Sequence, residues 1–71
     1  MSEHVLAEMV ANVWRVVASE GDRVEAGDTI CILESMKMEI PVEAPVAGTV
    51  ARVEVAEGAT VQEGDVIAVI E

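Results

Sequence analysis

The residue best suited to chemistry in this sequence is Lys37, the only lysine in a chain of 71 residues. A modification directed at a side-chain amine therefore has only one possible site, Lys37. Methionines flank this lysine at positions 36 and 38, and methionine is a soft, adaptable side chain suited to contact with transient partners. Composition alone leaves two interpretations open. Lys37 is either a modified lysine displayed between two contact residues, or an ordinary surface charge between two buried methionines.

Few other side chains offer a reactive group. The sequence holds one cysteine, Cys31, one histidine, His4, and three serines, and no spacing among them pairs a nucleophile with a base or forms a metal site. An acid, a base and a nucleophile therefore cannot be assembled for independent catalysis. We expect a protein that is not an enzyme and that has no catalytic residues and no bound metal.

Charge and hydropathy exclude several classes of partner. The net charge of −10 arises from 14 acidic and 4 basic residues, and it would repel nucleic acid and anionic membrane surfaces. The longest apolar runs, residues 30–33 and 66–70, are strand-sized and too short to span a bilayer. The first four residues lack the basic and apolar segments of a signal peptide. An unpaired Cys31 fits a reducing compartment, so we expect a cytoplasmic protein.

The length and apolar content indicate one small domain, residues 1–71, with a shallow core. Only one residue is aromatic, Trp14, so the core must consist mainly of Val, Ile, Leu, Ala and Met. We expect Trp14 to serve packing rather than recognition, as a lone aromatic residue in a strand usually does.

The sequence contains an internal repeat, in which residues 13–34 align with residues 50–71 without a gap. About ten of the 22 aligned pairs are identical, and the glycines and Gly-Asp pairs keep register. Each copy predicts a strand, a turn, a short bridging segment, a second turn and a second strand. The apolar period breaks between Val13 and Val16, and again between Val50 and Val53, which predicts a bulge or a change of sheet at both places.

Two such copies, each unable to bury its apolar face alone, predict a sandwich or flattened barrel with a pseudo-twofold axis. The segment that joins the copies contains Lys37. It has no counterpart in the second copy, so we expect it at the end opposite the chain termini. A two-residue loop there would demand positive φ, which Met and Lys adopt reluctantly, so this turn should be strained or of another type.

Residues 34–40, with the sequence Met-Lys-Met at their centre, resemble the attachment motif of the biotinyl-domain family. The resemblance extends over nearly the whole chain, including Gly48, Gly58 and the Gly64-Asp65 turn, and is most like the short stand-alone bacterial biotin attachment proteins. It implies an all-β fold, a flattened barrel of two four-stranded antiparallel sheets with the lysine on a tight hairpin. The chain lacks the insertion that forms a protruding thumb in some members.

The resemblance also implies a function. Biotin would be attached covalently to Lys37 by a biotin protein ligase, and would carry a carboxyl group between biotin carboxylase and carboxyltransferase subunits. The residues that these partners recognise would be Met36, Met38, Glu34, Ser35 and Glu39. For the two glutamates, ordinary solvated strand-end charge is a competing interpretation. We expect the carrier to be a monomer.

Two other functions remain alternatives. A lipoyl carrier of an acyl-transfer or glycine-cleavage system shares the fold and the hairpin lysine, although its lysine usually follows an acidic residue and precedes alanine. A structural or interaction domain without a cofactor would leave Lys37 unmodified, and would leave the solitary lysine and its flanking methionines unexplained.

Overall fold

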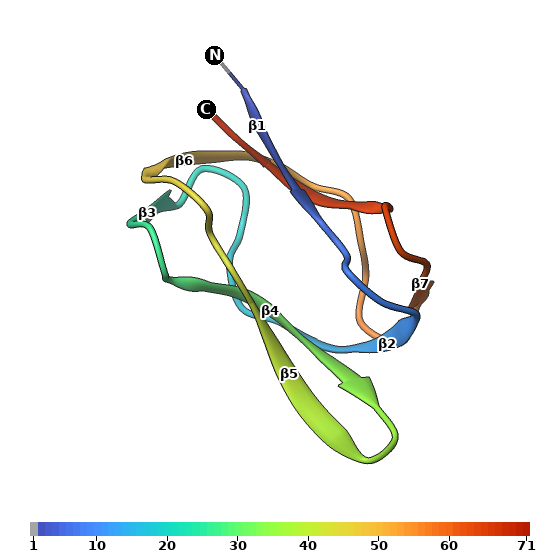
Figure 1. The fold of residues 1–71 in the computed structure, drawn as a ribbon. Helices are drawn as coiled ribbons and strands as arrows, with labels where there is room; N and C mark the ends of the chain where they lie inside the picture. The colour runs from blue at the N-terminus through green and yellow to red at the C-terminus, as the bar shows by residue number, and fades with distance from the viewer. Residues whose placement is uncertain (1) are drawn as a thin grey trace.

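The computed structural model describes residues 2–71, so that Met1, part of the N-terminal segment considered above, lies outside the described residues. Eight strands make up the fold (Figure 1): β1 (Glu3–Leu6), β2 (Ala11–Val16), β3 (Arg23–Val24), β4 (Thr29–Ser35), β5 (Met38–Glu43), β6 (Gly48–Val53), β7 (Thr60–Val61) and β8 (Val66–Ile70). Every strand pairing is antiparallel. None of the described residues forms a helix that could cross a membrane.

The strands form two four-stranded sheets, with orders β1-β8-β6-β3 and β5-β4-β2-β7. The all-β fold class predicted from the sequence is therefore confirmed. The short strands are exchanged between the copies, since β3 of the first copy pairs with β6 and β7 of the second copy pairs with β2. Each copy thus completes the sheet of the other. This exchange explains why a half-repeat of this size does not need to bury its apolar face alone.

Both predicted bulges are present. The register between β2 and β4 shifts between Val13 and Arg15, and the register between β6 and β8 shifts between Val50 and Arg52. An extra residue on one strand of an antiparallel pair bends that strand and increases its twist. The matching positions of the two bulges follow the internal repeat and help two short sheets to wrap around a common core.

Paired glutamates of the repeat support the two bulged strands. The backbone N–H of Val16 donates a hydrogen bond to Glu57 Oε2 at 3.0 Å, and the N–H of Val53 donates to Glu20 Oε2 at 3.4 Å. Each glutamate therefore binds the strand of the opposite copy. The repeat alignment matches Glu20 with Glu57, and the structure supplies the reason for their identity, which no sequence pattern indicated.

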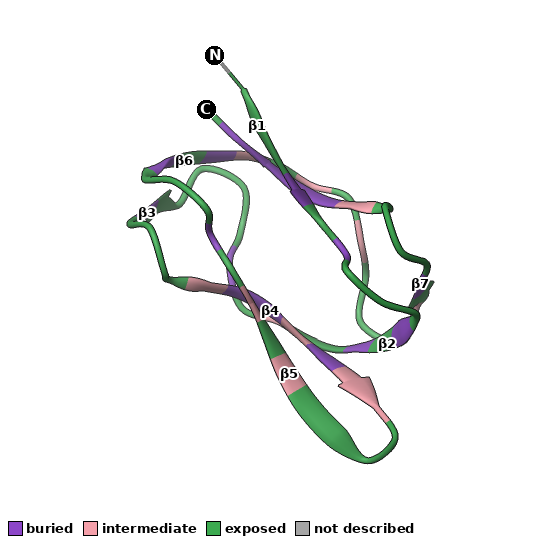
Figure 2. Ribbon diagram, viewed as in Figure 1, coloured by how far each residue is buried: buried purple, intermediate pink, exposed green. Residues whose placement is uncertain are grey.

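One continuous core lies between the sheets (Figure 2). Its fully buried large side chains are aliphatic apart from Cys31, and no polar or charged residue among residues 2–71 is buried. Trp14, expected to serve packing rather than recognition, does not belong to this core: the residue is 43% exposed, with the Arg15 guanidinium 5.1 Å from the ring centroid. Trp14 follows the regular inward and outward alternation of β2, in which Val13 is buried and Trp14 points outward, and the alternation breaks only after it, at Arg15.

The first residue of β6, Gly48, lies close to the C-terminus of the chain. A Cβ built on Gly48 would lie 2.6 Å from the carbonyl oxygen of Glu71 and 2.7 Å from a side-chain carbon of Ile70. Only glycine permits this approach. The second copy therefore begins against the end of its own last strand.

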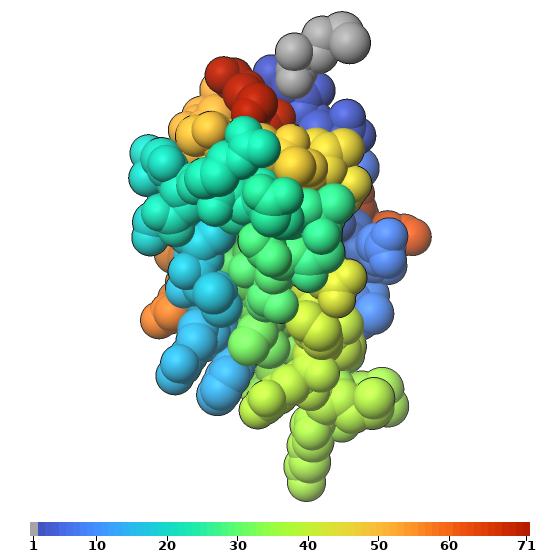
Figure 3. All heavy atoms as spheres, turned by 90° about the vertical axis from the view of Figure 1, so that its left-hand side faces the viewer, coloured from blue at the N-terminus to red at the C-terminus, as the bar shows by residue number. Residues whose placement is uncertain are grey.

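The hairpin of β4 and β5 projects from the body at the end opposite both termini (Figures 1 and 3). Six residue pairs join the two strands, from Thr29 opposite Glu43 to Ser35 opposite Met38. The predicted position of the Lys37 segment is confirmed. The tip of this hairpin is therefore remote from both chain ends.

Candidate functional site

Lys37 lies in the two-residue turn of the projecting hairpin. The last strand pair is Ser35 with Met38, so that Met36 and Lys37 alone form the loop. Their φ values are 54° and 65°. Positive φ at both central residues is the requirement of a type I′ turn, whose twist matches that of the flanking strands. Of the two alternatives predicted for this turn, the strained one is observed.

The turn stores strain because neither residue is glycine. A non-glycine residue in the left-handed region costs of order 1–3 kcal/mol and persists only where its surroundings over-determine it. Here the long pairing of β4 with β5 supplies that constraint. The hairpin therefore presents Lys37 in one backbone conformation at the extreme tip.

Both methionines face solvent. Met36 is 91% exposed and Met38 is 64% exposed, so the interpretation that they belong to the core is wrong. Exposed apolar surface that is contiguous can mark a site of contact with a partner. They leave a flexible apolar surface on each side of the lysine amine.

Two negatively charged residues face each other across the hairpin next to the turn. Glu34 and Glu39 are direct partners on β4 and β5, and like charges directly opposite one another destabilise a sheet. Glu34 is half-buried and Glu39 is exposed. The two ion pairs of the described residues, Arg23 with Glu25 and Arg52 with Glu54, do not involve Lys37. Lys37 is thus exposed to solvent, and two negatively charged side chains, Glu34 and Glu39, lie one strand pair below its turn.

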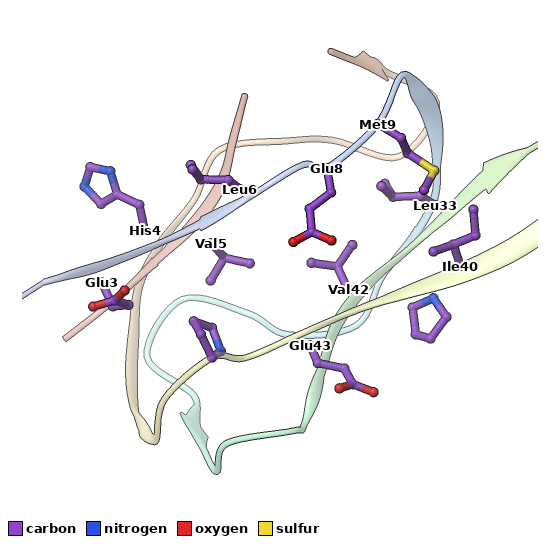
Figure 4. A pocket seen from close by; sticks show the side chains of 12 residues that line it. Glu3, His4, Val5, Leu6, Glu8, Met9, Leu33, Ile40, Val42 and Glu43 are labelled. Carbon is purple, nitrogen blue, oxygen red and sulfur yellow. The ribbon is translucent and has the colours of Figure 1, made fainter. Parts of the chain in front are cut away.

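Two hollows lie near this hairpin, and the larger one does not include its tip. A groove of about 420 Å³ separates the edge strands β1 and β5, and Val5 and Val42 point into it from opposite sides (Figure 4). The second hollow lies beside the turn and includes Lys37 in its lining. Its other walls come from the β2 side of the sheet, with Val10, Asn12 and Thr60 among them. Sequence reasoning did not identify these three residues, and no motif marks them.

Neither a metal centre nor a reactive thiol competes with Lys37. No group of three or more potential ligands occurs in the part of the chain that the structure describes. Burial raises the pKa of the Cys31 thiol to about 11, so that it stays protonated at neutral pH and is a poor nucleophile.

Comparison with known proteins identifies the family. Residues 4–70 match the family model described as "Biotin-requiring enzyme". The chain belongs to this family.

Two curated relatives and one solved structure illustrate the similarity. The chain is 62% identical over 50 residues to "Biotinylated protein TB7.3 homolog" of Mycobacterium leprae, with 70% of each chain covered. It is 59% identical over 44 residues to "Biotinylated protein TB7.3" of Mycobacterium tuberculosis, with 62% of each covered. Among solved structures, the Kluyveromyces lactis urea carboxylase matches with a TM-score of 0.94 and 39% identity, over 100% of this chain and 6% of that enzyme.

Proposed function

We propose that residues 1–71 form a biotinyl domain and that Lys37 carries covalently attached biotin. The observation that carries the proposal is the position of the only lysine. It lies at the tip of a projecting two-residue turn in a member of a biotin-requiring family. Two relatives of similar length bear the name "Biotinylated protein", which supports the same assignment.

The residues of the hairpin fit such an attachment. Lys37 is exposed and belongs to neither ion pair of residues 2–71, so its amine is free to enter the active site of a biotin protein ligase. Acylation forms an amide at Nζ and removes the charge of the lysine. The flanking Met36 and Met38 give the ligase an apolar surface on both sides, while Ser35 is small and half-buried at the last strand pair.

The chain would act as a carrier and not as an enzyme. Bound biotin supplies carboxyl transfer through its ureido ring, and the proposed partners are the biotin carboxylase and carboxyltransferase subunits of a carboxylase. The domain contributes a rigid body with one projecting arm, which raises the effective concentration of the arm at each active site. Glu34 and Glu39 present negative charge that would favour a basic partner surface.

A lipoyl carrier is the remaining alternative function. A Bacillus subtilis relative, 48% identical over 46 residues, bears the name "Biotin/lipoyl attachment protein". The methionine on each side of Lys37 favours biotin, because the lipoyl lysine usually lies between an acidic residue and alanine.

Co-expression with a biotin protein ligase tests the proposal. We expect the product to bind streptavidin, and we expect Lys37→Arg to abolish binding while the circular dichroism spectrum stays unchanged. Arginine keeps the charge and length of the side chain but offers no acylable amine. Streptavidin binding by the Lys37→Arg protein would refute the assignment.

A further inference from the structure

The hollow beside the turn has polar groups in an order that matches a ureido ring. Its lining includes Val10, Asn12, Glu34, Met36, Lys37 and Thr60. Three of these residues form a row across the outer face of one sheet, since Asn12 on β2 is the direct partner of Glu34 on β4 and of Thr60 on β7. Their side chains therefore lie on the same face, next to one another.

After the hydrogen bond within this row is counted, one donor group, on Asn12, and one acceptor group, on Glu34, remain unused. The Thr60 hydroxyl donates to Asn12 Oδ1 at 3.0 Å, which leaves the Nδ2 group of Asn12 to donate elsewhere. The Glu34 carboxylate only accepts. No hydrogen bond within the described residues joins Asn12 to Glu34, so both groups remain available. A ureido group has the complementary arrangement, a carbonyl acceptor flanked by N–H donors.

The hollow also offers apolar surface to the rest of the ligand. Two of its lining residues are exposed apolar side chains, Val10 at 57% and Met36 at 91%. A fused sulfur-containing ring and an alkyl chain would cover both side chains and remove them from water. The ligand chemistry that fits is therefore a small apolar body with a ureido head.

The tether makes even a weak site effective. Lys37 is itself one of the residues that line the hollow, so a group attached to its side chain is tethered next to the other lining residues. A short flexible linker gives an effective concentration of order 1 mM, so that an intrinsic dissociation constant of about 1 mM would leave the site roughly half occupied. A weak site of this kind would release the ring readily to a partner enzyme.

We propose that the hollow is a resting site for the biotin ring, with Asn12 and Glu34 binding the ureido group and Val10 and Met36 covering the apolar part. This inference rests on the proposed biotinylation of Lys37. Between visits to partner enzymes the ring would lie against the domain, and its apolar surface would not be fully exposed to solvent.

Amide NMR spectra of the unmodified and biotinylated chain test this site. The mass of each sample is measured first, so that attachment is established independently. We expect biotinylation to shift the signals of Val10 and Thr60 and the Nδ2 group of Asn12 as well as those of residues 34–40. We also expect nuclear Overhauser contacts between ring protons and the Val10 methyl groups.

Variants separate the hollow from the hairpin. Asn12→Ala should reduce the biotin-dependent shifts at Val10 and Thr60 by about half or more, with biotin still attached. The repeat supplies a control, because Thr49 of β6 directly precedes the second copy as Asn12 precedes the first, and Thr49→Ala should leave the shifts unchanged. Val10→Ser, in an exposed bend outside the strands, should remove the ring contacts.

The outcomes distinguish the two proposals. A biotinylated chain whose shifts are confined to residues 34–40, with no ring contacts at Val10, would overturn the resting site and leave the carrier function intact. A chain that acquires no biotin at Lys37 would overturn both proposals.

Discussion

Met36 and Lys37 occupy consecutive left-handed positions, with φ values of 54° and 65°, and together form the whole loop of the β4–β5 hairpin. The attachment lysine is therefore part of the turn and not merely close to it. Its presentation depends on strain that the paired strands maintain. The glycine turns of the body, such as the one at Gly58 with φ of 91°, need no such constraint.

Replacing Met36 with asparagine should relieve part of this strain. Asparagine tolerates the left-handed region better than methionine does, so Met36→Asn should raise the free energy of unfolding by about 0.5–1 kcal/mol. Urea unfolding measures the change. Met38→Asn is the matched control, because Met38 lies in β5 outside the left-handed region and should give no gain. Equal effects of the two variants would argue against strain at the turn.

The two methionines should matter for partner contact and not for stability. Changing Met36 and Met38 together to glutamine keeps the length of the side chains and removes their apolar ends. We expect slower biotinylation by the ligase, with a loss of stability below about 1 kcal/mol, as is usual at exposed positions. Ligation rates and urea unfolding of the same preparations provide the test. A loss of several kcal/mol would instead assign these side chains to packing.

Glu57 should stabilise the bulged strand β2 through its carboxylate. Glu57→Ala leaves the N–H of Val16 without its 3.0 Å partner, and we expect a loss of about 1 kcal/mol in the free energy of unfolding. Glu20→Ala should cost less, because its bond to Val53 is longer, at 3.4 Å. Glu63→Ala, at an exposed turn position without a hydrogen bond in the described structure, serves as the control. A loss of stability at Glu63 equal to that at Glu57 would contradict the role of this hydrogen bond.

The buried Cys31 thiol should make stability depend on pH in the alkaline range. Burial raises its pKa from 9.0 to about 11, so the folded state favours the protonated thiol. Its contribution is complete below pH 9 and is lost as the pH rises through the folded-state value, because the unfolded chain releases the proton first. Urea unfolding between pH 8 and pH 11 should show this decline in the parent chain. A Cys31→Ala chain with the same decline over that range would exclude the thiol as its source.

The repeat allowed most of the fold to be predicted. Glycines and apolar periods kept register between the copies, and the two breaks in period marked the bulges that the structure contains. The exchange of β3 and β7 between the sheets was not predictable. A strand of two residues is too short to show an alternation of apolar and polar residues. Trp14 takes an ordinary outward position of β2, between buried Val13 and exposed Arg15, and its aromatic type alone did not indicate that face.

Only those site residues that are contiguous in the sequence could be predicted. Lys37 and its neighbours are contiguous, so that their types and order were sufficient to identify them. Asn12 and Thr60 approach the turn through strand pairing between β2, β4 and β7. Their spacing in the sequence contains no sign of that contact, which depends on the register of three strands.

The most direct test of the central claim is peptide-resolved mass spectrometry of the chain produced in cells supplied with biotin and a biotin protein ligase. We predict a single biotinyl group, located on the peptide that contains Lys37 and absent from all others. The N-terminal amine is the internal control, because it is the other amine of the chain and should stay unmodified. A lipoyl group at Lys37, a biotinyl group elsewhere, or a fully unmodified Lys37 would contradict the account.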